Sequence, residues 1–450
     1  MANEHIEFKK RIDEALLTAA QKGQLWKHFH EHGSEAAFHE LERMITNAPV
    51  TRMRTESLPY PVWGAEGIDS ASRQQMNMAM RLPVSIAGAL MPDAHVGYGL
   101  PIGGVLAVDN AVIPYGIGVD IACRVRVSLF AVPQNFLEMQ RPHLVNALLT
   151  QTAFGKGCNW ANNPAQHEVM DSPLWNELPM MKPLKQNAAI QLGTSGGGNH
   201  FVEWGDFHLR EDFSSTLRAG YYLALASHSG SRALGMAIAN YFTDLAKKRH
   251  PDLKGEVANL SWLSLDEEEG QQYWKAMNLA GEYAHANHAV IHERVAQAID
   301  IRPVAHFENH HNFAWKETIT LGNGDQIDAI VHRKGATPAG HGVIGFIPGT
   351  MTHSGFLVEG RGSAASLNSA SHGAGRAMSR TVAKKTIDPD EVKRYLKRRR
   401  VQLLGAGLDE APFAYKNPEL VMAAQSDLVR TRGEFVPRIV RMADDGFTED

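Results

Sequence analysis

The chain has 450 residues, of which 44% are hydrophobic and 21% are charged, and this is the composition of a large globular protein. Its 45 Lys and Arg residues nearly balance its 49 Asp and Glu residues, so the net charge of -4 excludes a polycationic protein, and nucleic-acid binding would need a local patch. The 22 histidines are the feature to explain, because imidazole is the commonest metal ligand and titrates near neutral pH.

The sequence contains no recognisable membrane or secretion signal. The N-terminal residues lack an apolar signal region, and no run of about 18 apolar residues occurs. Only two cysteines are present, Cys123 and Cys158, which suits a reducing compartment. We therefore expect a soluble, cytoplasmic protein with no membrane partner.

Residues 1–47 are predicted to form a short helical extension. Apolar residues recur there at helical spacing, as at Phe8 and Ile12. The pair Gly33 and Ser34 separates two helical stretches, and the segment 47–49, Asn-Ala-Pro, closes the second.

The rest of the chain alternates between strand and helix patterns. Gly-punctuated runs rich in Val and Ile predict short strands and turns in two zones, residues 85–130 and 303–376. Helices are predicted for residues 134–152, 214–227, 232–249 and 267–299, and for a basic segment from Asp388 to about Leu404. This mixture indicates an α+β fold, and the spread of polar Gly-rich segments favours one site built from many loops.

Several of these segments carry metal-ligand chemistry. Asp120 and Cys123 are three residues apart at a strand end, so a turn can bring both to one cation, although a buried cysteine also packs as a small hydrophobe. His200 follows a Gly-rich loop, His228 lies between two predicted helices, and His311 belongs to an adjacent pair of which one member is the expected ligand. A histidine alone is more often a hydrogen-bonded structural residue than a ligand. Together the five supply enough ligands for two divalent ions, with zinc favoured by Cys and His and manganese left open.

The segment SASHGAGRAMSR, residues 369–380, has the pattern of a nucleophile. Glycines clear the approach to His372, and Arg376 and Arg380 behind it suit phosphate. Neutral imidazole attacks phosphorus without prior deprotonation, so His372 is a candidate for covalent catalysis. The alternative is a Gly-rich turn that leads into a helix.

These segments occur in an order that resembles a known family. The motifs PDAHVGYGLPIGG, GIGVDIACRVR, LGTSGGGNHFVEW, SHSGSRALG, HHNFAW, HRKGATPA, IPGTM, SHGAGRAMSR and AYKNPELVMAAQSDLV are similar to those of the RtcB family of RNA-splicing ligases. The resemblance spans about residues 48–435. It implies a single large α+β catalytic domain over residues 48–450, with mixed sheets and helices around a central metal cleft, preceded by the helical extension of residues 1–47.

The resemblance also implies an activity. Family members join RNA ends that bear a 2′,3′-cyclic phosphate or 3′-phosphate to 5′-hydroxyl ends, in RNA repair or tRNA splicing. They consume GTP and use two Mn²⁺ ions, and the path runs through a guanylyl-histidine intermediate. An archease-type activator is a further partner that the resemblance suggests.

By motif position, each candidate residue receives a role. His372 would be the nucleophile, and Asp93 would orient it. The metal ligands would be Asp120, Cys123, His200, His228 and His311. The GTP contacts would be Asn199, Glu203, Asn312, Pro348, Gly349, Thr350, Met351, Gly373, Ala374, Gly375, Arg376 and Lys416.

Three positions differ from the commoner family pattern. Arg124 stands where a glycine usually follows the cysteine, which would put a bulky cation near the metals. Gly355 stands where a serine near the base is usual, and Pro338 replaces an arginine. Two alternatives therefore stay open: a metal-dependent RNA phosphoesterase that does not ligate, and a non-catalytic RNA-binding protein on the same fold.

A basic run follows the nucleophile and allows two interpretations. It is either a solvated helix face or a track for RNA phosphates, whose binding would weaken with salt. Its members are Lys384, Lys385, Lys393, Arg394, Lys397, Arg398, Arg399 and Arg400.

Overall fold

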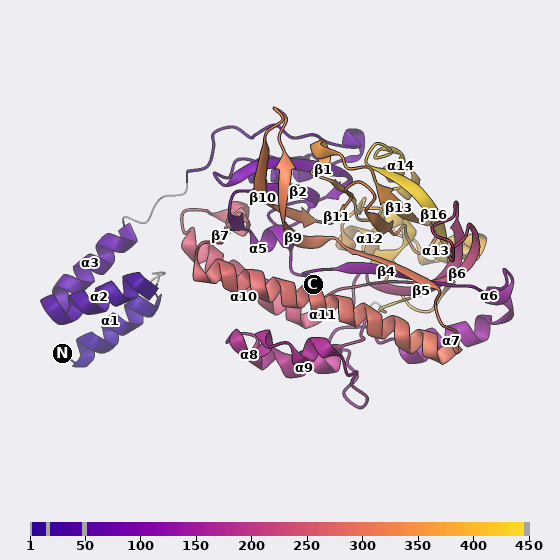
Figure 1. The fold of residues 1–450 in the computed structure, drawn as a ribbon, viewed down its shortest axis with the longest axis horizontal. Helices are drawn as coiled ribbons and strands as arrows, with labels where there is room; N and C mark the ends of the chain where they lie inside the picture. The colour runs from indigo at the N-terminus through magenta and orange to yellow at the C-terminus, as the bar shows by residue number, and fades with distance from the viewer. Residues whose placement is uncertain (1, 15–18, 47–51, 445–450) are drawn as a thin grey trace.

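The N-terminal helices form a small bundle with a core of its own. The structure, a computed structural model, describes residues 2–14, 19–46 and 52–444. The helices are α1 (Ala2–Glu14), α2 (Ala19–His32) and α3 (Ser34–Thr46), and Figure 1 shows them beside the main body. Their buried cluster contains Phe8, Ile12 and Leu41. The predicted helical extension is confirmed as three helices rather than two, while its closing segment 47–49 and the predicted boundary between residues 47 and 48 lie outside the described residues.

The main body mixes helices and strands, which confirms the predicted α+β class. Its helices are α4 (Ser70–Ala79), α5 (Pro114–Ile117), α6 (Phe136–Met139), α7 (Arg141–Gln151), α8 (Leu174–Glu177), α9 (Lys185–Gln191), α10 (Arg232–Arg249), α11 (Glu268–Ile299), α12 (Arg380–Thr386), α13 (Pro389–Arg399) and α14 (Pro418–Ala423).

The strands form two larger sheets and two small ones. A four-stranded antiparallel sheet has the order β1 (Ser85–His95), β2 (Ile102–Val108), β10 (Gln326–Lys334), β9 (Asn312–Thr320). An eight-stranded sheet has the order β12 (Ile344–Ile347), β13 (Gly355–Gly360), β16 (Val429–Met442), β5 (Phe201–Leu209), β6 (Gly220–Ser229), β4 (Arg124–Phe130), β8 (Ala305–His310), and β15 (Gln402–Leu403) pairs with β16. The two-stranded sheets pair β11 (Ala336–Pro338) with β14 (Ser369–Ser371) and β3 (Ala111–Val112) with β7 (Leu263–Ser264).

The eight-stranded sheet explains why distant motifs meet. Neighbouring strands β5, β6, β4 and β8 are antiparallel, so the starts of β5 and β4 and the ends of β6 and β8 lie at one edge. Phe201 at the start of β5 pairs with His228 near the end of β6, and Arg124 at the start of β4 pairs with His310 at the end of β8. The segments that flank these strand ends are therefore brought together at one edge of the sheet.

The helix predicted for residues 214–227 is wrong, because the segment contributes the central strand β6. Its residues from Tyr222 to Ser229 are buried, between β5 on one side and β4 on the other. A strand that is covered on both faces has a continuous apolar run, such as LALA here, and this pattern does not separate strand from helix.

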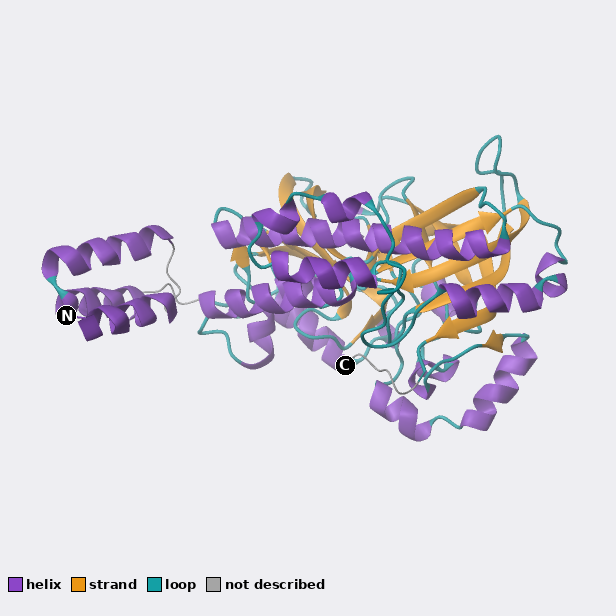
Figure 2. Cartoon of the chain, turned by 90° about the horizontal axis from the view of Figure 1, so that it is seen from below, coloured by secondary structure: helices purple, strands orange, loops and turns teal. Residues whose placement is uncertain are grey.

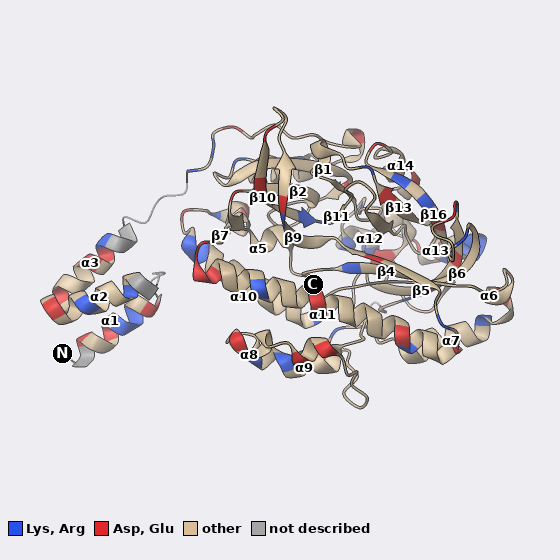
Figure 3. Cartoon of the chain, in the orientation of Figure 1, with Lys and Arg blue, Asp and Glu red and all other residues tan. Residues whose placement is uncertain are grey.

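Two long helices cover one face of the molecule. The predicted helices at 232–249 and 267–299 are confirmed as α10 and α11, which pack against each other, and α11 also contacts α7, β6 and β4. Figure 2, which views the molecule from below, shows long helices in front of the strands. Figure 3 shows acidic and basic residues interspersed along these helices, and none of the described helices is long and apolar enough to cross a membrane.

Candidate active site

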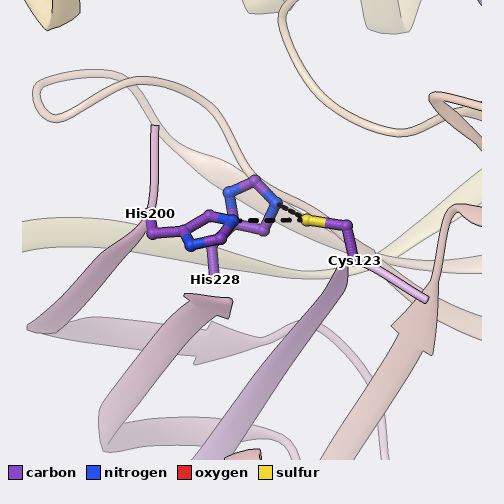
Figure 4. A group of neighbouring side chains, drawn as sticks. All are labelled: Cys123, His200 and His228. Carbon is purple, nitrogen blue, oxygen red and sulfur yellow. Dashed lines mark hydrogen bonds between the residues drawn. The ribbon is translucent and has the colours of Figure 1, made fainter. Parts of the chain in front are cut away.

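A thiol and two imidazoles meet at the shared edge of β4, β5 and β6. Cys123 Sγ lies 3.0 Å from His228 Nε2 and 3.6 Å from His200 Nε2, as Figure 4 shows. All three side chains are buried. These are the atom types that bind zinc and other borderline divalent ions.

Asp120 and His311 extend this group on either side. His200 Nε2 lies 3.0 Å from Asp120 Oδ2, and His228 Nε2 lies 3.2 Å from His311 Nε2. Gly230 makes room for the carboxylate, since a Cβ there would lie 2.1 Å from Asp120 Oδ1. The structure thus brings all five predicted ligand positions together.

The outer hydrogen bonds aim the ring nitrogens inward. His200 Nδ1 donates to the Ser195 carbonyl at 2.8 Å, and His228 Nδ1 donates to the Asn199 carbonyl at 3.1 Å. In these tautomers each Nε2 presents a lone pair, so the lone pairs face the carboxylate, the thiol or another ring at contact distance. A shared cation would relieve that arrangement, and a metal-bound histidine usually donates its other ring N–H to a backbone carbonyl in this way.

The protonation states also suit a cation. Burial holds the pKa of both His228 and His311 well below the usual range, so the rings are neutral and able to bind a metal. Burial, followed by the Asp120 charge, raises the pKa of the Cys123 thiol, and a bound cation would reverse this by favouring the thiolate. The donor set therefore fits a divalent ion.

His372 is held by a buried carboxylate next to this group. Its Nδ1 donates to Asp93 Oδ2 at 2.7 Å, and its ring centroid lies 4.8 Å from that of His311. The backbone N–H groups of His372 and Gly373 donate to the same oxygen at 3.1 and 3.3 Å. Gly375 has φ of 72°, and a Cβ there would lie 2.1 Å from the Asp93 carbonyl oxygen, so only glycine lets the loop sit on β1. In this tautomer the lone pair of the ring is on Nε2.

One cavity of about 400 Å³ joins the ligand group and His372. Most of the predicted nucleotide contacts line it, and burial raises the pKa of one of them, Glu203, well above its usual value. Three predicted site residues, Asp93, His200 and Lys416, stand behind the lining. The predicted residues that line it are Asp120, Cys123, Asn199, Glu203, His228, His311, Asn312, Pro348, Gly349, Thr350, Met351, His372, Gly373, Ala374, Gly375 and Arg376.

Three of the predicted nucleotide contacts also have structural partners. Lys416 Nζ donates to the carbonyls of Pro92 and Ala94 at 3.2 and 2.6 Å, on either side of Asp93. Arg376 donates to the Asp409 carbonyl at 2.7 Å. The amide of Asn312 is likewise engaged, since it donates to the Asp120 carbonyl at 3.2 Å and accepts from Gly335 N at 2.8 Å.

Two further charged residues line the cavity: Lys334, which the sequence did not single out, and Arg380, which it assigned to phosphate. Lys334 is buried, and burial lowers the pKa of its ammonium to about 7. Arg380 pairs with Asp409 at 2.6 Å and with Glu410, which also accepts from Tyr415. The motif HRKGATPA contains Lys334, so its position in a motif was the available signal.

The expectation that Arg124 lies near the metals is wrong. Successive side chains of a strand point to opposite faces, so Arg124 points away from the side that Cys123 faces. Its guanidinium donates to Glu308 at 2.9 Å, to His285 Nδ1 at 3.2 Å and to His310 Nδ1 at 3.1 Å. The side chains of His310 and His311 likewise point in opposite directions, as predicted for the adjacent pair: His310 contacts Arg124 and His311 contacts His228.

Gly355 and Pro338 also lie outside the cavity lining. A Cβ on Gly355 would lie 2.6 Å from Phe346 Cζ, so a serine there would collide with the core. The neighbouring hydroxyl of Ser354 donates to Glu434 at 2.7 Å. Pro338 ends the edge strand β11, where it pairs with Ser369. The three departures thus leave the ligand group and His372 unchanged.

The basic run after the nucleophile lies on α12 and α13, except for Arg400, which follows α13. In α13 the apolar side is buried through Val392 and Leu396, while Lys393 and Arg394 are exposed and pair with Asp390 and Asp388. This arrangement fits the solvated helix face.

Fold and site together define an α+β protein with a candidate metal centre beside an oriented histidine. Comparison with known proteins then assigns the family: residues 74–443 match the model of the tRNA-splicing ligase RtcB family. The chain is 32% identical over 411 residues to the RNA-splicing ligase RtcB of Escherichia coli (strain K12), which covers 84% of this chain and 95% of that protein.

Two further relatives come from other organisms. The RNA-splicing ligase RtcB homolog 2 of Entamoeba dispar is 32% identical over 426 residues, with 79% of this chain and 80% of that protein covered. The tRNA-splicing ligase RtcB of Thermococcus kodakarensis is 29% identical over 419 residues, with 79% and 86% covered. The chain belongs to the RtcB family, a family of RNA ligases.

Proposed function

We propose that this chain is a GTP- and Mn²⁺-dependent RNA ligase that joins 2′,3′-cyclic phosphate or 3′-phosphate RNA ends to 5′-hydroxyl ends. The observation that carries the proposal is the Asp93–His372 pair, whose bond of 2.7 Å leaves Nε2 free within the cavity that the ligand group lines. A histidine oriented by a carboxylate beside a cation site is suited to nucleophilic attack on the phosphorus of a nucleoside triphosphate.

In the first step, His372 Nε2 attacks the α-phosphorus of GTP. The P–N bond forms as the bond to pyrophosphate breaks, and pyrophosphate leaves. Asp93 accepts the Nδ1 proton in a hydrogen bond throughout, which stabilises the positive charge that develops on the ring. The product is a guanylyl-histidine.

In the later steps, the GMP group passes from His372 to the RNA 3′-phosphate and is then displaced by the 5′-hydroxyl of the second strand. A 3′-phosphate oxygen, exposed by hydrolysis where the end began cyclic, attacks the guanylyl phosphorus, and the P–N bond breaks to restore His372. The 5′-hydroxyl of the second strand then attacks the RNA phosphorus and GMP leaves. Residues 348–351 and Glu203 are proposed to hold the guanosine, and Lys416 is the proposed contact with the least geometric support, because its ammonium is already engaged by two carbonyls.

Asp120, Cys123, His200, His228 and His311 would hold two divalent ions. Bound there, the ions would neutralise the triphosphate and stabilise charge on the attacking and leaving oxygens. The proposed set places Cys123 at the centre, within 3.6 Å of two of the histidines.

The test is covalent labelling. Purified protein incubated with Mn²⁺ and α-labelled GTP should form an acid-labile adduct, and a 3′-phosphate RNA should then be joined to a 5′-hydroxyl RNA. The variant His372→Ala should form no adduct. Absence of label in the unmodified chain, or label that persists in this variant, would refute the proposal, and RNA that is opened or shortened without GTP would support the phosphoesterase alternative instead. Adding an archease-type protein to the same reaction tests whether an activator is a partner.

A further inference from the structure

One wall of the cavity carries exposed apolar side chains. In the described part of the chain, three of the twelve exposed large apolar side chains line this cavity: Tyr98 at 73% exposure, Val96 at 53% and Val119 at 40%. Exposed apolar groups that gather at a pocket mark a binding surface rather than chance exposure.

The loop that carries Tyr98 is held rigidly although the ring is exposed. Gly97 N donates to Gln75 Oε1 at 3.0 Å, and Gln75 Nε2 donates back to the Gly97 carbonyl at 2.5 Å. Lys334 Nζ donates to the Tyr98 carbonyl at 2.6 Å and to the Tyr115 carbonyl at 3.0 Å. The ring is thus presented to solvent from a fixed backbone, which reduces the entropy lost when a ligand stacks on it.

The segment that holds this wall also approaches His372, and the wall differs from the proposed guanosine wall. Gly335 follows Lys334, and a Cβ there would lie 2.2 Å from Ile102 Cγ2 and 3.1 Å from His372 Cε1. The guanosine wall of residues 348–351 instead approaches the loop at Gly373, where a Cβ would lie 3.5 Å from the Pro348 carbonyl oxygen. The Tyr98 wall is therefore available to the second substrate.

The chemistry of this wall suits a nucleobase. The Tyr98 and Tyr115 ring centroids are 6.3 Å apart, and Lys247 Nζ lies 5.7 Å from the Tyr115 centroid, with Asp244 also close enough to raise the Tyr115 pKa after burial and Tyr98. Flat π faces with a neighbouring cation are the features on which unpaired bases stack.

We propose that Tyr98 is the stacking platform for an unpaired base at the RNA end that reacts at His372. This rests on the proposed function, and it names the part of the RNA that the cavity recognises. Because every base has a π face, the platform would accept RNA ends of any sequence.

The experiment measures binding of a short single-stranded RNA with a 3′-phosphate to the full chain in Mn²⁺, by fluorescence anisotropy. Tyr98→Ala should weaken binding by about 5- to 100-fold, the range that loss of one stacked base produces. Tyr98→Phe keeps the ring and should bind within about twofold of the unmodified chain. Tyr241→Ala is the matched control, since Tyr241 is 51% exposed on α10 outside the cavity lining, and it should have no effect.

A second RNA, abasic at its 3′-terminal nucleotide, identifies the contact. It should bind the unmodified chain and Tyr98→Ala equally well, because the stacking partner is gone from the RNA in both cases. Equal losses for intact and abasic RNA would overturn the proposal, as would wild-type affinity in Tyr98→Ala. A loss confined to labelling by GTP would assign the ring to the guanosine and overturn it as well.

The two proposals fail separately. If the unmodified chain forms no guanylyl adduct, the ligase proposal fails, while the RNA titrations still decide whether Tyr98 stacks a base.

Discussion

Asp93 concentrates its hydrogen bonding on one oxygen. The carboxylate is fully buried, and Oδ2 accepts from the His372 ring and from two backbone N–H groups, while Oδ1 has no hydrogen-bond partner among the described residues. A residue 279 positions away in sequence therefore sets both the tautomer of His372 and the path of its loop.

The substitution Asp93→Asn tests this arrangement. The amide preserves the shape but can turn a donor toward three N–H groups, which disfavours the tautomer with a free Nε2. We expect the rate of guanylyl adduct formation to fall by about 10²- to 10⁴-fold, as for other carboxylates that orient a histidine. Initial labelling rates at saturating GTP measure it, with His372→Ala as the zero reference, and a fall of less than about threefold would contradict the assigned role.

For single residues, the sequence predicted which residues belong to the site better than it predicted where their side chains point. The motifs grouped Cys123, His311 and His372 because those residue types are rare in such combinations, and the structure brings the three to one cavity. The direction of Arg124 was missed, since strand alternation decides it and the strand was predicted without its exact start.

Asn287 shows how an element can position a site that it does not line. This residue of α11 is fully buried, and its Nδ2 donates to the Thr194 carbonyl at 2.9 Å and to Ser229 Oγ at 3.1 Å. Ser229 Oγ donates to the Ser195 carbonyl at 3.0 Å, the same carbonyl that accepts from His200. The helix thus ties the loop before β5 to the end of β6.

We predict that Asn287→Ala loosens this connection. Several buried polar groups lose a partner at once, so the free energy of unfolding should fall by about 2–4 kcal/mol. The affinity for Mn²⁺ or Co²⁺ should fall by about 10- to 100-fold, as it does when residues that orient metal ligands are replaced in other proteins.

The matched control for Asn287→Ala is Asn278→Ala. Asn278 lies on the same helix, is partly exposed and bonds only locally, from Nδ2 to the Trp274 carbonyl at 2.7 Å. Urea unfolding and calorimetric metal titration of both variants measure the effects. Equal metal affinities for the two variants would show that α11 does not position the ligands.

At the level of elements, helical periodicity predicted α10 and α11 but failed for β6. Both helices have one apolar face and one solvent-exposed polar face, and this periodic contrast can be recognised in a single sequence. The strand β6 has two covered faces, so its pattern depends on neighbours far away in the chain.

Buried histidines make the stability of the whole molecule depend on pH. Burial lowers the pKa of His288 to about 3 and of His332 to about 4, and it holds that of His292 well below the usual value. The unfolded chain, with a histidine pKa near 6.5, therefore binds more protons than the folded chain below that pH. Stability is fully present above about pH 6.5 and is lost as the pH falls toward the folded pKa values.

We predict that the free energy of unfolding falls by up to about 1.4 kcal/mol per pH unit for each such histidine. Urea midpoints at pH 8, 7, 6 and 5, with a chelator present, measure it. The variant His288→Leu should show a shallower dependence below pH 6.5, and a midpoint that stays constant from pH 8 to 5 would contradict the prediction.

The N-terminal bundle provides a test of domain organisation. Phe8 is fully buried against Trp26, Phe29 and Phe38, with ring centroids 5.3, 4.7 and 5.0 Å away. Phe8→Ala should lower the free energy of unfolding of the bundle by about 3–5 kcal/mol, which is enough to unfold a domain with so small a core. We propose that residues 1–47 fold separately from residues 48–450.

Differential scanning calorimetry of the full chain distinguishes the outcomes. We expect an early transition that Phe8→Ala abolishes and a later one that it leaves in place. A single transition that shifts as a whole would show that the bundle and the catalytic body unfold together.

The sequence alone determined the residue types of the site, the amphipathic helices and the family. These follow from local pattern and from rare motifs, neither of which depends on how the chain is folded in space. The tertiary structure decided which side chains face the cavity. In the folded chain Arg124 pairs with Glu308, the Lys416 ammonium donates to a carbonyl next to Asp93, and the ring of Tyr98 is exposed. Those outcomes depend on strand register and on contacts between segments hundreds of residues apart, and no local pattern encodes them.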